Sequence, residues 1–235
     1  IAGAIEYAAL ATKSKKGGIF SDRIFISDRK GELIVYGTNN AILNMVKCGP
    51  VNLTGGQDVT DIILAGKSAV KVAKLLKEEQ LKCILTKHIE CVILCLKSIG
   101  IYIKLPYIMG DTPDIKELML EVAKCDNKLE VESAPLLVPP KEIMPVGEYT
   151  TINISPGSNV RVSMNHPGGR SSFDTEIPVS SFIPMTNIIV KKNEFFPSLS
   201  GLPGVFYIKW IGTEPVFIVL KDQNRLSVHA TVLGG

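Results

Sequence analysis

The sequence has 235 residues, of which 46% are hydrophobic and 21% charged, and its formal net charge is +3. This composition is typical of a globular protein with a sizeable core, and it excludes a disordered tail and a strongly basic binder of the histone type. The longest apolar stretch, residues 84–103, is interrupted by charged side chains such as Lys87, Glu90 and Lys97, so we expect no membrane helix. The sequence also opens without the basic and apolar segments of a secretion signal, and none is expected.

The first part of the chain predicts a mixture of helices and strands. Apolar spacing indicates a short helix over 5–12, closed by Gly17 and Gly18. Strands at 23–27 and 32–37 flank a four-residue turn and predict a hairpin. Further strands are expected at 39–47 and 62–64, 81–86, 91–96 and 100–105, with a helix at 115–124.

The most regular helical pattern covers residues 67–80. Apolar residues recur there at the spacing of one helix face: Ala69, Val70, Val72, Ala73 and Leu76. Lysines recur on the opposite face at i, i+4, i+7 and i+10: Lys67, Lys71, Lys74 and Lys77. At 100° per residue they form one stripe, and the preceding helix ends in a second basic group: Lys13, Lys15 and Lys16. Such rows match phosphates without reading base sequence, although a solubilising surface is the alternative.

Composition changes near residue 128. All five cysteines precede this point and 11 of the 14 prolines follow it. Residues 1–128 hold 18 basic and 14 acidic side chains, whereas the remainder holds 8 and 9. We therefore predict a basic domain over 1–128, a proline-rich connector over 129–145 and a strand-rich domain over 146–235.

The second domain is predicted to be mostly strand. Its expected strands cover 149–154, 159–164, 173–179, 186–190, 205–211, 215–220 and 226–232. A short helix is expected at 193–199, although Pro197 disfavours it. Both halves end alike, with a helical segment followed by three strands.

Motifs for catalysis and metal binding fail on spacing. Gly66-Lys67-Ser68 opens a helix as a phosphate-binding loop does, but Asp61 stands where that motif needs glycine. The three histidines are scattered, and the five cysteines fit buried reduced thiols better than a zinc site. We predict no catalytic residues, no metal and no cofactor. An enzyme built from loops, with His166 and Arg170, is the weaker alternative.

The order of helix, hairpin, basic helix and three short strands resembles one domain of the DNA sliding clamps, the ring-shaped polymerase processivity factors. The run 101–114 (IYIKLPYIMGDTPD) looks like the clamp segment in which a strand leads into a proline-containing turn. The run 206–220 (FYIKWIGTEPVFIVL) looks like the last hairpin of a clamp. Chain length is similar to that of the two-domain clamps that assemble as trimers, including those of phages and viruses.

The resemblance implies an α+β fold of two clamp-like domains, with antiparallel sheets and a few helices on one face. It implies a homotrimeric ring that encircles double-stranded DNA and tethers DNA polymerase, with a clamp loader as a further partner. The basic rows would face DNA, and an apolar pocket for partner peptides would be flanked by Leu136, Leu137 and Val138. The expected compartment is the cytoplasm, of the host if the protein is viral, with the nucleus left open. The second half departs from the family, because it predicts no first helix and no lysine-rich second helix.

A β-rich structural or assembly protein, for example a viral one, is the alternative from another class. On that hypothesis the two halves are packing modules and the lysines only keep the surface soluble.

Overall fold

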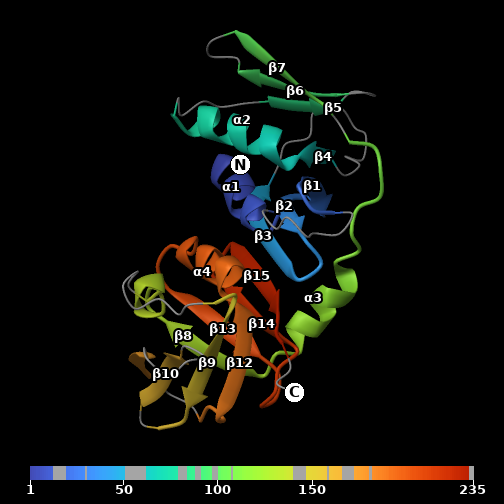
Figure 1. Ribbon diagram of the computed structural model, residues 1–235. Helices are drawn as coiled ribbons and strands as arrows, with labels where there is room; N and C mark the ends of the chain where they lie inside the picture. The colour runs from blue at the N-terminus through green and yellow to red at the C-terminus, as the bar shows by residue number, and fades with distance from the viewer. Residues whose placement is uncertain are drawn as a thin grey trace. The chain divides into compact units, whose positions relative to one another are not determined.

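The computed structural model describes residues 1–12, 20–29, 31–50, 62–78, 84–87, 91–96, 100–106, 108–139, 147–157, 159–165, 172–179 and 182–232. The chain divides into two compact units, unit 1 over 1–113 and unit 2 over 114–235 (Figure 1). No helix within the described ranges is long and apolar enough to cross a membrane.

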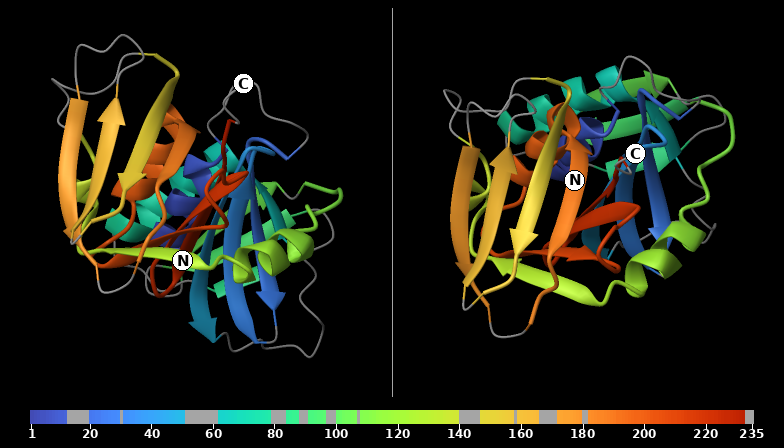
Figure 2. Two further views of the ribbon diagram at one scale, coloured as in Figure 1. Left: turned by 90° about the horizontal axis from the view of Figure 1, so that it is seen from below. Right: turned by 60° about the horizontal axis from the view of Figure 1, so that its bottom comes forward.

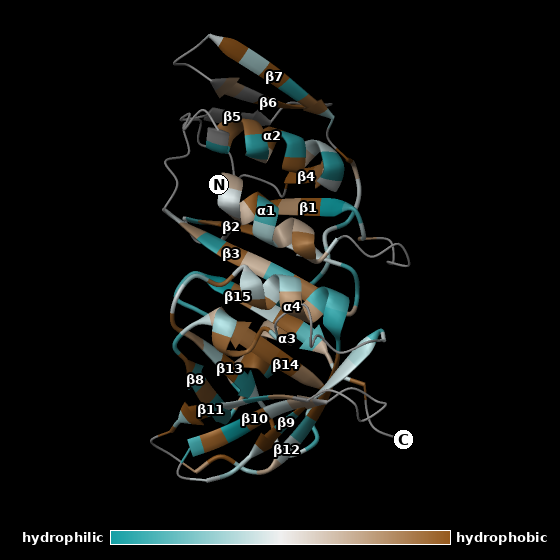
Figure 3. Cartoon of the chain, turned by 60° about the vertical axis from the view of Figure 1, so that its left-hand side comes forward, coloured by the Kyte–Doolittle hydropathy of each residue, from teal (hydrophilic) through white to brown (hydrophobic). Residues whose placement is uncertain are grey.

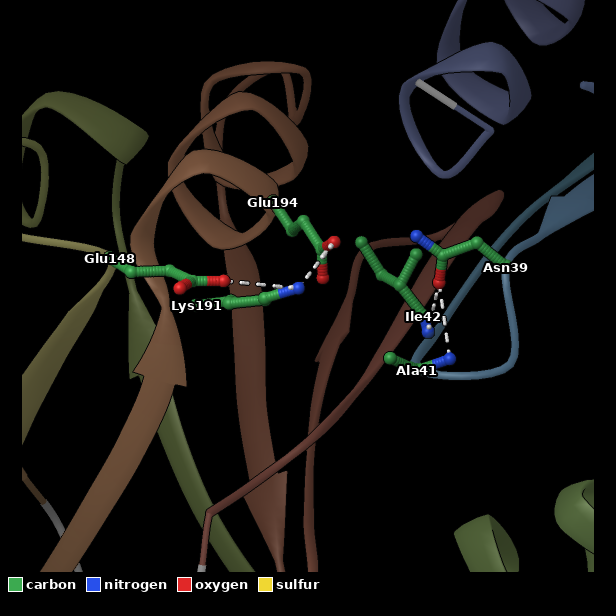
Figure 4. A network of polar contacts seen from close by, with 6 residues as sticks. All are labelled: Asn39, Ala41, Ile42, Glu148, Lys191 and Glu194. Atoms are coloured by element: carbon green, nitrogen blue, oxygen red, sulfur yellow. Dashed lines mark hydrogen bonds and ion pairs between the residues drawn. The ribbon is translucent and has the colours of Figure 1, made fainter. Parts of the chain in front are cut away.

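Unit 1 contains an antiparallel sheet with the strand order β4-β1-β2-β3. The strands are β1 (Arg23–Arg29), β2 (Glu32–Thr38), β3 (Ile42–Pro50) and β4 (Ile62–Ala65). The predicted hairpin is confirmed, with Phe25 opposite Tyr36. The strand expected from residue 39 begins later because the Asn39 side chain accepts hydrogen bonds from the N–H groups of Ala41 and Ile42, at 3.1 and 3.0 Å. Figure 4 shows how these two bonds turn the chain before β3.

Two helices lie on one face of this sheet. Helix α1 (Ala2–Leu10) packs on β2 and β3, and α2 (Gly66–Glu78) packs beside it (Figure 1). The contact with β2 is close, because a Cβ atom at Gly37 would lie 2.5 Å from the carbonyl oxygen of Ala8. The side chain of Asn44 donates a hydrogen bond to the carbonyl of Tyr7 at 3.1 Å. These contacts fix α1 on the sheet, and α1 in turn supports α2.

The three strands expected after the second helix are confirmed. They are β5 (Ile84–Lys87), β6 (Cys91–Leu96) and β7 (Ile101–Pro106), and they form one antiparallel sheet. Cys91 and Cys95 lie on β6 as free thiols, the first buried and the second half-buried. Beyond β7, the N–H of Ile108 donates to the carbonyl of Ile63, which ties this segment to β4.

Unit 2 begins before the point of compositional change. It opens with α3 (Lys116–Ala123), where a helix was expected, and continues into β8 (Asn127–Val131) and the 3-10 helix η1 (Ala134–Leu136). Strand β8 lies at the predicted boundary near residue 128, yet it pairs antiparallel with β13 and buries Leu129 and Val131 completely. This pairing places residues 127–131 within unit 2. The division between the two compact units lies further upstream, after Pro113.

Two antiparallel sheets build the rest of unit 2 (Figure 2). The first has the order β11-β10-β9-β12 and the second β15-β14-β13-β8. Their strands are β9 (Tyr149–Ser155), β10 (Asn159–Asn165), β11 (Ser172–Pro178), β12 (Thr186–Lys191), β13 (Phe206–Trp210), β14 (Phe217–Lys221) and β15 (Arg225–Ala230). Helix α4 (Lys192–Ser200) accommodates Pro197 and buries Phe195 and Leu199, so the helix predicted at 193–199 is confirmed.

The two units repeat one chain path. In each, three consecutive strands form a meander, the fourth pairs back on the first, and a helix begins at the next residue. Three antiparallel strands then follow. Helices α2 and α4 therefore occupy equivalent positions in the repeat. The position of α1 is taken in unit 2 by the single turn of η1, as far as the described residues show.

Candidate nucleic-acid interface

Helix α2 starts at a position where glycine allows a close approach to Asp22. The N–H of Gly66 donates to the carbonyl of Asp22 at 2.7 Å, immediately after the last residue of β4. A Cβ atom at Gly66 would lie 2.9 Å from the Asp22 carboxylate and 3.2 Å from its carbonyl oxygen. The sequence Gly66-Lys67-Ser68 thus begins a helix against β1, and the glycine has a packing role.

The burial pattern of α2 fixes the direction of its lysines. Ala69, Val72, Ala73 and Leu76 are each less than a tenth exposed and form the core side of the helix. The opposite side carries the exposed lysines Lys67, Lys71, Lys74 and Lys77. Figure 3 shows the resulting alternation of hydrophilic and hydrophobic bands along α2. The predicted stripe is therefore present as a solvent-facing row, which we call the α2 lysine row.

One member of the α2 lysine row has a carboxylate partner. The Nζ atom of Lys77 lies 3.2 Å from Oε2 of Glu6 on α1. Lys67, Lys71 and Lys74 form no ion pair with any of the described residues. Three ammonium groups are thus left to attract an anionic ligand, since exposed lysines without partners keep their full charge toward solvent. The second predicted basic group, Lys13, Lys15 and Lys16, lies outside the described residues.

The equivalent helix of unit 2 has a different electrostatic character. Lys191, directly before α4, lies 3.4 Å from Glu148 and 3.6 Å from Glu194 (Figure 4). Partial burial by itself lowers the pKa of Lys191, because it disfavours the charged ammonium form. The neighbouring carboxylates of Glu194 and Glu148 have the larger combined effect, and the pKa of Lys191 is raised. Lys192 and Glu194 are the charged residues of α4 itself. Helix α4 contains a single lysine and therefore carries no lysine row.

The three apolar residues predicted to flank a peptide pocket differ in exposure. Leu136 is 37% exposed at the end of η1, and Val138 is half-buried. Leu137 is only 1% exposed, because its N–H bonds back to the carbonyl of Ala134 and the turn directs its side chain into the core. Leu136 and Val138 are therefore at least partly exposed, whereas Leu137 is buried.

The described residues of unit 2 contain one buried histidine. The Nε2 atom of His229 lies 2.7 Å from Oγ of Ser227, and the Phe195 ring packs edge-on against the imidazole at 5.4 Å. Burial lowers the pKa of His229 to about 3. The pair is sealed inside the unit and cannot reach a substrate. His166 and Arg170 lie outside the described residues, and no described cluster of three His, Cys, Asp or Glu residues could hold a metal ion.

The sequence analysis did not predict two ion pairs between a lysine and a carboxylate that is distant in the sequence. Glu6 meets Lys77 across 71 positions, and Glu148 meets Lys191 across 43. Neither pair falls at a helical spacing, so no local pattern indicates it.

No protein-family model matches the sequence, and a search of curated proteins found no match. Solved structures do match. A DNA polymerase sliding clamp from Bacillus subtilis has a TM-score of 0.78 at 14% identity, covering 100% of this chain and 62% of that one. A putative DNA polymerase III β subunit from Eubacterium rectale has a TM-score of 0.79 at 12% identity, covering 98% and 62%. A Helicobacter pylori β clamp bound to a DNA ligase peptide has a TM-score of 0.77 at 12% identity, covering 99% and 63%.

These similarities establish the predicted fold class. The chain has the α+β fold of the DNA polymerase sliding clamps, with antiparallel sheets and helices. It spans somewhat more than 60% of the length of the clamps it matches. The neighbours named here are bacterial, and the phage-like or virus-like origin stays a prediction.

Proposed function

We propose that this chain acts in a DNA sliding clamp, which encircles double-stranded DNA and tethers a DNA polymerase without reading base sequence. The observation that carries the proposal is the α2 lysine row on a unit with the clamp fold. Lys67, Lys71 and Lys74 provide point charges at the spacing of successive helical turns. Contacts of this kind attract phosphates but specify no base.

Encirclement explains why so few contacts suffice. A ring holds DNA by topology, so each lysine–phosphate contact can be weak and exchange rapidly while the ring moves. The proposal includes no catalytic step and no cofactor. Lys13, Lys15 and Lys16 belong to the proposed DNA-facing set.

The proposed partners are short peptide tails of DNA polymerase and of a clamp loader. We place them beside the exposed Leu136 and the half-buried Val138, with the buried Leu137 as the third member of the predicted set. The Helicobacter pylori clamp held with a DNA ligase peptide is a precedent for peptide binding by this fold. The proposed assembly is a homotrimer in the cytoplasm.

Native mass and DNA retention test the proposal together. Light scattering should give three times the chain mass, and the assembled ring, once loaded, should remain on nicked circular DNA while sliding off the linearised plasmid. The charge reversal K71E/K74E should reduce retention and leave the native mass unchanged. The matched control K116E/K221E reverses two exposed lysines of unit 2 and should retain DNA as the unmodified chain does. Equal retention by the two double variants would remove the α2 lysine row from the function, and open assemblies without DNA retention would favour a structural protein.

A further inference from the structure

Helix α1 presents a negative charge to the α2 lysine row. Residues 2–10 contain no lysine or arginine, and Glu6 is their one charged side chain. The side chain of Glu6 is 29% exposed and that of Lys77 is 67% exposed, so the pair lies at the surface shared by the two helices. Any polyanion approaching the row near Lys77 therefore meets a carboxylate as well.

The pair makes the four lysines unequal. A carboxylate at 3.2 Å attracts the Lys77 ammonium and repels a phosphate competing for it. Lys67, Lys71 and Lys74 have no such competitor within the described residues. The exposed side of α2 thus carries three lysines without an ion pair among the described residues and one lysine, Lys77, that is paired with Glu6.

We infer that Glu6 lowers the affinity of the α2 lysine row for duplex DNA by holding Lys77 in an ion pair, which leaves Lys67, Lys71 and Lys74 to contact phosphates. This inference rests on the proposed function and assigns a residue that sets the strength of its DNA contact. A carboxylate in this position weakens binding where a mobile ring needs weak binding.

A double-mutant cycle between Glu6 and Lys77 tests the inference. The assay is fluorescence anisotropy of a labelled duplex of mixed sequence, titrated with the full chain carrying E6Q, K77Q or both changes. The matched control is E32Q, which removes one carboxylate and breaks the ion pair of Glu32 with Lys47 at 3.3 Å, away from α2. Circular dichroism melts check that each variant is folded.

E6Q should bind DNA more tightly than E32Q, and K77Q should weaken binding more in the E6Q background, where Lys77 can contact a phosphate, than in the unmodified chain. The logarithm of the binding constant falls linearly with the logarithm of the salt concentration, and each phosphate contact adds about 0.9 to that slope. The ratio of the E6Q affinity to the E32Q affinity should therefore shrink about threefold between roughly 50 and 200 mM salt. Equal affinities for E6Q and E32Q would overturn the inference. So would equal losses of affinity on K77Q in the unmodified chain and in the E6Q background. If K71Q and K74Q also leave binding unchanged, it is the proposed function that fails, and the inference fails with it.

Discussion

Unit 2 should lose stability in mild acid because of one buried imidazole. His229 is 3% exposed, with Ser227 as its hydrogen-bonding neighbour and Phe195 against its ring. Burial disfavours the charged form and lowers the pKa of His229 to about 3 in the folded chain. An unfolded chain takes up this proton near pH 6.5. The stabilisation is therefore present above about pH 6.5 and is lost as the pH falls toward 3.

The size of the effect follows from the two pKa values. The unfolded chain binds almost one more proton than the folded chain at about pH 5.5, and hardly any more at about pH 7.5. Integrating between these values, His229 alone should lower the free energy of unfolding by about 1.4 kcal/mol. This change is large against the marginal stability of a domain.

Trp210 provides the assay. It is the single tryptophan of the chain and is fully buried on β13, so its fluorescence reports the unfolding of unit 2. Urea titrations at the two pH values should show the loss in the unmodified chain. H229Q keeps a polar atom for Ser227 but cannot titrate, so its free energy of unfolding should change much less between the two pH values. An equal pH dependence in H229Q and the unmodified chain would refute the reasoning.

Three further predictions concern packing and charge. G37A should destabilise unit 1 by about 2 kcal/mol or more, because the new Cβ atom would lie 2.5 Å from the Ala8 carbonyl oxygen. Thermal melts should show this loss in G37A and not in the control G3A, whose Cβ atom would meet nothing within 4 Å. L137A should lower the free energy of unfolding by about 2–4 kcal/mol and L136A by less than about 1 kcal/mol, since only Leu137 is buried. Urea titration followed by Trp210 fluorescence measures both losses, and equal losses would contradict the assigned burial. K71E/K74E should change the free energy of unfolding, measured by urea titration, by less than about 0.5 kcal/mol, because both lysines are exposed and have no ion-pair partner in the described part of the chain. A larger loss would show that these lysines support the fold.

Local features of the structure could be predicted from sequence because they depend on residues close in the chain. The α2 lysine row follows from helical periodicity, and the angle of about 100° between Leu76 and Lys77 is enough for one to be buried and the other exposed. The hairpin of β1 and β2 likewise follows from two apolar runs around a short turn. The resemblance to the clamps extended these local patterns to a fold, and the structure confirms that step.

Features that depend on distant residues could not be predicted in the same way. Proline content and charge change near residue 128, but Leu129 and Val131 belong to unit 2 because they pair with residues 206–208. The pocket prediction treated Leu136 and Leu137 alike, since an apolar run does not show which side chain a 3-10 turn directs inward. The pairing of Glu6 with Lys77 required the packing of α1 against α2.

The comparison of α2 with α4 separates what the fold determines from what the sequence adds to it. Both helices begin directly after the fourth strand of a sheet with the same strand order, so the fold gives them equivalent positions. Their charges differ, because α2 has three exposed lysines without partners among the described residues, whereas Lys191 beside α4 is held between Glu148 and Glu194. Since the fold is the same and the charge is not, the α2 lysine row is not a by-product of the clamp architecture. A solubilising role would not require one helix to be basic and its counterpart balanced, which favours a ligand of negative charge at unit 1.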